Sequence, residues 1–421
     1  MKKRCVLIGI DGVPFRLMDD LSEQGVMPYF RELKEEGNFY TMSSSLPDVS
    51  SVSWSSIITG KNPGEHSIYG FTELIPGSYT ISFPHFGKLK APPFWKREGT
   101  FCVINVPSTY PAGEVNGVLI SGFISPDLER AVYPPEYVTV LENFEYKIDV
   151  DTKRARKSPM LLFKELSEAL ESRIKVYNYF WEKLNWDVFM FVITGSDRLG
   201  HFLWNAYEDE THEYHHKFLE FFTRVDECIK DIGERLTGND SLFILSDHGM
   251  DRIKSSVNVN CYLEEEGFLI RGRDPKKGYS NIKEGTQAFA LDPARIYINK
   301  EGKYPSGCVA PEEEKTLINE LIKAFDSLEK DGEKVIKKIY SRDQIYHGTY
   351  TDSAPDLVLL PCRGFNLKGG ILPERVFDTD ELSGMHTQDD AFLYTRGDIN
   401  LPDTLSVEDV VPLVNQSMGW I

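Results

Sequence analysis

The sequence predicts an α/β protein with a mostly parallel sheet, helices on both faces of that sheet, and one inserted segment. Two observations carry this prediction. Short, continuous apolar runs alternate with long helical patterns, and this alternation is interrupted by a single charged, glycine-rich region. Alternating helices and apolar strands are typical of a parallel sheet that is covered on both faces. The length of 421 residues fits one large core that carries an insertion.

The predicted strands are apolar runs without polar alternation, as expected for strands buried on both faces. They cover residues 5–10, 101–106, 117–123, 187–194, 241–246 and 355–361. Helical patterns span residues 28–36, 159–184 and 211–236. In the first of these, Phe30 and Leu33 share one face, and Gly37 is expected to end the helix.

The insertion is predicted where the texture of the sequence changes. Between about residues 265 and 350, charged and glycine-rich segments surround one helix expected at 311–329. We therefore expect a core formed by residues 1–264 and 351–421. Residues 265–350 are expected to form an inserted cap that contributes to specificity.

The charge of the chain limits its partners. Asp and Glu outnumber Lys and Arg by 65 to 47, which gives a formal net charge of −18. Such a chain repels nucleic acid backbones and anionic membranes unless a local positive centre overrides the repulsion. We therefore expect neither a nucleic acid polymer nor a membrane as a partner. The sequence gives no indication of the oligomeric state.

Targeting signals and cysteine pairs are not evident in the sequence. The apolar run after the basic start MKKR is shorter than the roughly seven residues that a signal peptide needs. No stretch approaches the roughly 20 apolar residues of a membrane span. The six cysteines are scattered without a CxxC pair, which favours reduced thiols. These features predict a soluble, cytoplasmic protein.

Three predicted strands are each followed closely by an aspartate. Asp11 follows the strand at 5–10, whereas Asp197 and Asp247 follow the apolar runs VIT and FILS. Because the carboxyl ends of parallel strands meet at one edge of a sheet, these side chains are expected to converge. Three carboxylates can share a buried site only if cations neutralise them.

Three histidines accompany these aspartates. His201 lies four residues after Asp197, His248 directly follows Asp247, and His386 lies in a loop after Gly384. A single Asp-x-x-x-His pair more often decorates a helix. Its occurrence together with the other strand-end aspartates favours a metal site, because His and Asp are the usual ligand mixture for zinc or manganese.

The remaining histidine-rich segment has a different interpretation. His212, His215 and His216 have spacing that could suit a metal, but their segment is acidic and aromatic and follows no strand. We expect them on a solvated helix face. His66 is expected to position a turn.

Several motifs support a family resemblance. Residues 45–71, SLPDVSSVSWSSIITGKNPGEHSIYGF, place Ser50 nine residues before a Thr-Gly pair. A DxxGH element spans 197–201, an SDHGM element spans 246–250, and a GxH element spans 384–386. In this order, and with Asp11 after the first strand, the chain resembles type I phosphodiesterases and nucleotide pyrophosphatases of the alkaline phosphatase superfamily.

The resemblance implies an alkaline-phosphatase-like core that uses two divalent metal ions, expected to be zinc, with manganese as the alternative. It implies hydrolysis of a small phosphate ester, such as a nucleotide, through a phosphoserine on Ser50. The ligands that it implies are Asp197, His201 and His386 for one ion, and Asp11, Asp247, His248 and the oxygen of Ser50 for the other. A metal would activate the serine hydroxyl, which is otherwise a poor nucleophile at neutral pH.

One departure from the family pattern affects the expected substrate. Ser53 stands where animal nucleotide pyrophosphatases usually place an asparagine that holds a phosphate oxygen. The segments 105–111, 115–123 and 353–361 look more like a prokaryotic and archaeal branch described as phosphohydrolases or phosphomutases. The sequence thus leaves monoesters, diesters and nucleotides open as substrates. A phosphomutase with the same nucleophile and a non-catalytic metal- or nucleotide-binding protein are the alternatives.

Overall fold

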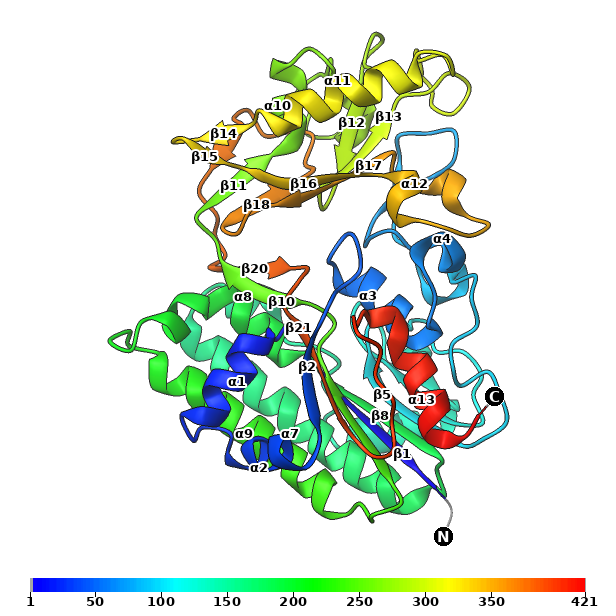
Figure 1. Ribbon diagram of the computed structural model, residues 1–421, viewed down its shortest axis with the longest axis vertical. Helices are drawn as coiled ribbons and strands as arrows, with labels where there is room; N and C mark the ends of the chain where they lie inside the picture. Colours follow the sequence, from blue (N-terminus) through cyan, green and yellow to red (C-terminus); the bar gives the residue numbers. More distant parts are fainter. Residues whose placement is uncertain (1–2, 421) are drawn as a thin grey trace. The chain divides into compact units, whose positions relative to one another are not determined.

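The computed structural model describes residues 3–420, which form two compact units (Figure 1). Within the described residues, unit 1 comprises 3–61, 85–251 and 382–420, and unit 2 comprises 62–84 and 252–381. The predicted insertion at 265–350 lies within unit 2, which extends beyond it on both sides and also includes 62–84. Each unit is described separately below.

Unit 1 is built around an eight-stranded sheet. The strands, in spatial order, are β2 (Asn38–Met42), β21 (Ala391–Arg396), β9 (Ser241–Leu245), β1 (Cys5–Ile10), β8 (Val188–Ile193), β5 (Phe101–Val106), β6 (Gly117–Ser121) and β7 (Val132–Tyr133). The five strands from β9 to β6 run parallel, whereas β2, β21 and β7 form antiparallel pairs. The predicted mostly parallel sheet is confirmed.

Side chains of the central strands face two separate hydrophobic cores. In β1, Val6 and Ile8 belong to one core, and Cys5 and Leu7 belong to the other. This alternation follows from the two-residue period of a strand, and it explains why both faces need apolar residues. The sheet therefore has helices on both faces, as predicted.

The two helix layers of unit 1 differ in size (Figure 1). The first core is covered by α1 (Phe15–Glu23), α2 (Pro28–Glu36), α7 (Pro159–Lys183), α8 (Gly195–Glu208) and α9 (His215–Glu234). The second core is covered mainly by α3 (Ser50–Thr59) and α13 (Val410–Met418). Helix α2 has the predicted bounds, with Phe30 and Leu33 buried. The helix predicted at 211–236 begins only at His215.

Unit 2 contains its own sheets and core. A four-stranded antiparallel sheet has the order β12 (Ala288–Leu291), β13 (Arg295–Ile298), β17 (Leu357–Pro361) and β16 (Ile336–Ser341). A three-stranded sheet contains β18 (Phe365–Lys368), β11 (Ser255–Asn258) and β19 (Phe377–Asp378). Helices α10 (Val259–Glu265) and α11 (Glu314–Asp326) contribute to the hydrophobic core of this unit. The apolar run at 355–361 thus supplies a strand of unit 2.

Within residues 3–420, no helix combines the length and the apolar character needed to cross a membrane. The six cysteines are free thiols, as predicted.

Candidate metal centre

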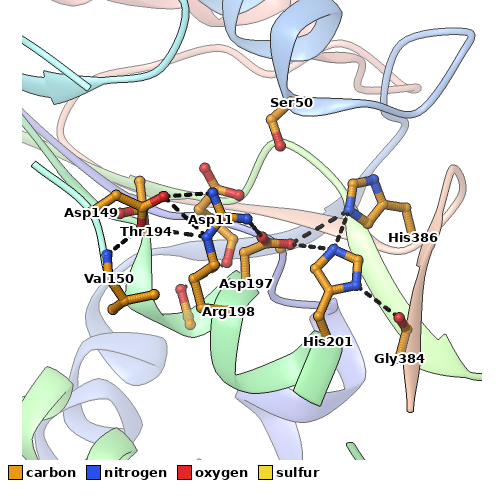
Figure 2. Close-up of polar contacts among 12 residues, drawn as sticks. Asp11, Ser50, Asp149, Val150, Thr194, Asp197, Arg198, His201, Gly384 and His386 are labelled. Atoms are coloured by element: carbon orange, nitrogen blue, oxygen red, sulfur yellow. Dashed lines mark hydrogen bonds and ion pairs between the residues drawn. The ribbon is translucent and has the colours of Figure 1, made fainter. Parts of the chain in front are cut away.

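Three neighbouring parallel strands bring the predicted aspartates together. Asp11 directly follows β1, Asp247 lies two residues after β9, and Asp197 lies in the first turn of α8, which follows β8. Because β9, β1 and β8 are adjacent in the sheet, the three carboxylates meet at its carboxyl edge. Asp11 and Asp197 are drawn close together in Figure 2.

The histidines divide this assembly into two groups of candidate metal ligands. One group is Asp11, Asp247 and His248, and the other is Asp197, His201 and His386, with the ligand atoms of each group within 4.8 Å of one another. These are the two sets that the family resemblance implies. We call them the buried cluster and the outer cluster, because the first is entirely buried, whereas the second is partly exposed.

The outer cluster converges on one carboxylate oxygen. Asp197 Oδ1 lies 3.3 Å from His201 Nε2 and 3.5 Å from His386 Nε2 (Figure 2). The two Nε2 atoms are only 2.9 Å apart. His386 is delivered by β20 (Gly384–Thr387), which pairs with β10 (Gly249–Arg252) in a separate two-stranded sheet.

Each of the three carboxylates has one oxygen fixed by the protein. Trp54 Nε1 donates to Asp11 Oδ2 at 2.9 Å, the Gly12 amide donates to Asp247 Oδ1 at 3.1 Å, and Arg198 Nη1 donates to Asp197 Oδ2 at 3.0 Å. The other oxygen of each carboxylate is buried and accepts no hydrogen bond from the described residues. Buried acceptors normally have a donor, so three open oxygens at one place fit a site that binds cations.

The three histidines are oriented in the same way. The Nδ1 atoms of His201, His248 and His386 lie 2.8, 2.9 and 2.8 Å from main-chain carbonyl oxygens. A carbonyl can only accept a hydrogen bond, so each Nδ1 carries the proton and donates it. In the neutral rings, each Nε2 then presents its lone pair to the centre, which is how metal-bound histidines are usually held.

Protonation inside this centre is strongly perturbed. Burial, followed by the neighbouring Asp247 and Asp197 carboxylates, raises the pKa of Asp11 well above its ordinary value. Burial also raises the pKa of Asp247 to about 7, and it lowers the pKa of His248 well below its ordinary value. These shifts reflect mainly the cost of burying a charged group, and a bound cation would offset that cost for the carboxylates.

Ser50 lies beside the buried cluster. It is the first residue of α3, and its Oγ lies 3.1 Å from His248 Nε2. Its side chain is therefore next to both a candidate ligand and the positive end of a helix dipole. Ser53 is less available than Ser50, because its hydroxyl is already hydrogen-bonded to the Ser44 and Ser45 hydroxyls at 2.9 and 2.8 Å.

The histidines outside the predicted site have other contacts. His215 Nδ1 donates to the Ala206 carbonyl at 2.8 Å, and His212 Nε2 lies 3.3 Å from Asn205 Nδ2. His66 is buried, and its Nδ1 accepts from the Ile68 amide at 3.1 Å, which fits the predicted turn. None of these histidines belongs to either candidate cluster among the described residues.

Sequence reasoning missed the groups that hold the carboxylates. Trp54 is fully buried against the second core, so it is positioned to orient Asp11 and not to stack on a ligand. Arg198 links Asp197 to Asp149, which accepts from Arg198 Nη2 at 2.7 Å (Figure 2). Gly12 has a positive φ of 69°. In the sequence, the only sign of these orienting groups is that Gly12 directly follows Asp11 and Arg198 directly follows Asp197.

The fold and the site define an α/β protein with two candidate metal sites at one edge of its sheet. Comparison with protein families gives the narrower assignment, since residues 5–389 match the model described as type I phosphodiesterase / nucleotide pyrophosphatase. The chain belongs to this family, within the alkaline phosphatase superfamily, and is a metal-dependent phosphohydrolase. The predicted resemblance is confirmed. Comparison with curated proteins gives no match.

Solved structures show the same fold at low sequence identity. Phosphonoacetate hydrolase from Sinorhizobium meliloti 1021 in complex with phosphonoacetate has a TM-score of 0.69 and 14% identity, over 99% of this chain and 96% of that chain. Its complex with phosphonoformate has a TM-score of 0.67 and 15% identity over the same shares. Murine ectonucleotide pyrophosphatase / phosphodiesterase 5 in complex with AMP has a TM-score of 0.58 and 13% identity, over 99% of this chain and 95% of that chain.

Proposed function

We propose that the chain hydrolyses phosphate esters with two bound divalent metal ions and a phosphoserine intermediate on Ser50. The observation that carries the proposal is the set of open ligand atoms. Three carboxylate oxygens lack a hydrogen-bond donor among the described residues, and three imidazole Nε2 atoms face the same centre. Such a donor set suits zinc, which we propose as the metal, with manganese as the alternative.

The proposed roles of the ligands follow the two clusters. Asp11, Asp247 and His248, together with the Ser50 oxygen, would hold one ion, and Asp197, His201 and His386 would hold the other. When bound, the two ions would neutralise the phosphoryl charge, lower the pKa of the serine hydroxyl and activate water. The orientation of each ligand by a second group would keep this arrangement in place between turnovers.

Ser50 would act as the nucleophile. Its oxygen would attack phosphorus in line with the ester oxygen, so that the bond from phosphorus to Ser50 forms as the ester bond breaks. The alcohol would leave with a proton, and water would then hydrolyse the phosphoserine and release phosphate or a phosphate monoester. The N-terminus of α3 supports this role, because its dipole favours negative charge on the phosphoryl oxygens.

The substrate class is proposed to be a small phosphate monoester or diester. The solved structures of the same fold bind phosphonoacetate, phosphonoformate and AMP, which are small phosphorus compounds. Ser53 does not support a preference for nucleotides, because its hydroxyl is engaged by Ser44 and Ser45. We also propose that residues 265–350 act as a cap that contributes to specificity.

The test is hydrolysis by protein stripped of metal and resupplied with zinc or manganese. The substrates are p-nitrophenyl phosphate, bis-p-nitrophenyl phosphate and thymidine 5′-p-nitrophenyl phosphate. We expect turnover only with metal, and we expect a quenched reaction to show one phosphoryl group on the peptide that contains Ser50. Turnover without metal would contradict the proposal. Silence on all three substrates with both ions bound would favour a phosphomutase instead.

A further inference from the structure

Arg173 is a buried cation that the mechanism above does not use. It lies on α7, and only 1% of the residue is exposed. Its Nη2 donates to the Ile148 carbonyl at 2.7 Å and to Thr194 Oγ1 at 2.9 Å, and both of these acceptors are neutral. Among the described residues, no carboxylate forms an ion pair with Arg173. Because buried charges are usually paired, this arrangement calls for a role other than neutralising a neighbour.

The bond to Thr194 fixes the start of the helix that carries two candidate ligands. Thr194 directly precedes α8, and Asp197 lies in the first turn of this helix. His201 follows on the same helix and belongs with Asp197 to the outer cluster. In Figure 2, Thr194 lies on the opposite side of Asp197 from His201 and His386. A shift of Thr194 would therefore move two of the three ligands of the outer cluster.

A second buried side chain holds the same point. Asn105, at the end of β5, is fully buried. Its Nδ2 donates to the Val192 carbonyl at 3.1 Å and lies 3.4 Å from Thr194 Oγ1. Its Oδ1 accepts from the Tyr146 hydroxyl at 3.1 Å. The connection from β8 to α8 is thus held both from α7 and from a neighbouring strand.

The bond to Ile148 leads to the outer cluster by a separate route. Asp149, the next residue, accepts from Arg198 Nη2 at 2.7 Å and from Arg198 Nε at 3.1 Å. Arg198 Nη1 in turn donates to Asp197 Oδ2 at 3.0 Å. One guanidinium group, that of Arg173, therefore supports the carboxylate of Asp197 both through its helix and through its hydrogen-bond donor.

The buried cluster has different supports. Asp11 is held by the Trp54 indole, and Asp247 is held by the Gly12 amide. Arg173 donates to none of these groups. A loss of Arg173 should therefore be felt at one cluster and not at the other.

We propose that Arg173 is a positioning residue for the outer cluster, and that it acts through Thr194 and through the segment of Ile148 and Asp149. This inference rests on the proposed function, because it requires that the outer cluster bind a divalent ion. It assigns the geometry of that ion's ligands to a residue that touches neither the ligands nor the substrate.

The test is a calorimetric titration of the metal-free protein with zinc, which measures the affinity of both sites. Arg173→Met keeps a long, unbranched side chain and removes both hydrogen bonds. It should lower the zinc affinity of one site by about 30-fold, because groups that orient metal ligands usually contribute about ten- to hundredfold to affinity. That site should be the one that His386→Ala also weakens, and the other site should be unchanged.

Substitutions at Thr194 test the same contact with less disturbance of the core. Thr194→Val removes the hydroxyl, but both of its donors keep a second acceptor, the carbonyl of Ile148 or of Val192. It should lower zinc affinity at the outer site by about tenfold. Thr194→Ser keeps the hydroxyl oxygen, so it should keep the affinity.

Tyr177→Phe is the matched control on α7. Tyr177 lies four residues after Arg173 and is 1% exposed, and its hydroxyl donates to Asp231 Oδ2 at 2.6 Å. The change removes a hydrogen bond of the same helix that leads away from α8. It should lower the melting temperature without changing zinc affinity at either site.

The outcomes separate this inference from the proposed function. Unchanged zinc affinity in Arg173→Met and Thr194→Val would overturn the inference while leaving the two-metal site intact. Equal losses at both sites, or an equal loss in Tyr177→Phe, would also overturn it, because they would show only a general effect of packing. A loss in Thr194→Ser as large as that in Thr194→Val would contradict the role of the hydroxyl. If the unsubstituted protein binds no zinc, the proposed function fails first, and the inference fails with it.

Discussion

The two candidate clusters have the same kinds of ligand but different surroundings. In the buried cluster, Asp11, Asp247 and His248 have no solvent exposure. In the outer cluster, His201 and His386 each keep 19% of the side chain exposed. The buried cluster also lies beside Ser50, whereas the exposed rings of the outer cluster are within reach of water. This difference is consistent with separate roles, in which the buried cluster would activate Ser50 and the outer cluster would admit water.

The supports of the two clusters differ as well. The buried cluster is held by neutral donors, the Trp54 indole and the Gly12 amide. In the outer cluster, the carboxylate of Asp197 is held by a cation, Arg198. A cationic donor competes with a metal ion for the charge of the carboxylate. We therefore expect the outer cluster to release its ion more readily, and the following predictions test this comparison.

The largest expected effect is that of Ser50→Ala. It should lower turnover by about 10⁴-fold, because it removes the nucleophile, as nucleophile deletions do in other hydrolases. Both metal ions should remain bound, because each cluster keeps three protein ligands. The measurements are hydrolysis rate and metal content of the purified variant. Ser55→Ala is the control, since the Ser55 hydroxyl donates within α3 to the Ser51 carbonyl at 2.6 Å. A fully active Ser50→Ala would rule out the mechanism.

Asp247→Ala should abolish the buried site selectively. It removes one of the three protein ligands that would hold the buried ion beside Ser50, so we expect a loss of one ion per chain and about a 10³-fold loss of activity. Metal content and rate should be measured together. The outer ion should remain, and a variant that lost both ions would show that the two clusters do not bind independently.

His386→Ala should weaken the outer site without emptying the buried one. We expect activity to fall by about 10²-fold, and we expect added zinc to restore part of it, since Asp197 and His201 remain to bind the ion. Activity titrated against zinc concentration measures this effect. His212→Ala is the matched control, because His212 belongs to neither cluster. If added zinc restores no activity to His386→Ala, Asp197 and His201 do not suffice to bind the ion.

The smallest expected effect comes from a residue that does not contact the metal. Trp54→Phe removes the donor to Asp11 Oδ2 and should weaken metal affinity at the buried site by about tenfold. Trp95→Phe is a close control. Trp95 is also buried in the second core, and its Nε1 has no hydrogen-bond acceptor among the described residues. Competition with a chelator measures both variants, and equal losses would indicate a packing effect only.

The features that could be predicted from the sequence are those set by local pattern. The strands β1, β8 and β9 are continuous apolar runs, and such runs bury both faces of a sheet. Once the strands are placed, the aspartates after them must lie at one edge. Helix α3 gave no comparable signal, because all ten of its residues are buried and five of them are serines. A helix buried on all sides has no polar face, so it lacks the amphipathic period by which helices are recognised.

The supports of the site could not be predicted, because they join residues that are distant in the sequence. Arg198 and Asp149 are 49 positions apart, and Trp54 and Asp11 are 43 apart. No spacing rule connects such pairs, since only the folded sheet brings them together. The same limit applies to residues 62–84, which lie far from 252–381 in the chain but belong to the same unit.

Adding a side chain at Gly12 would disturb the whole metal centre. A Cβ at this position would lie 2.8 Å from Asp197 Oδ1, and the Gly12 amide is the donor that holds Asp247. The backbone there is also left-handed, a conformation that side chains disfavour. In a library of variants, position 12 should therefore accept no other amino acid without loss of activity, although it is neither a ligand nor a nucleophile. Even Gly12→Ala, which adds only one methyl group, would disturb both clusters at once.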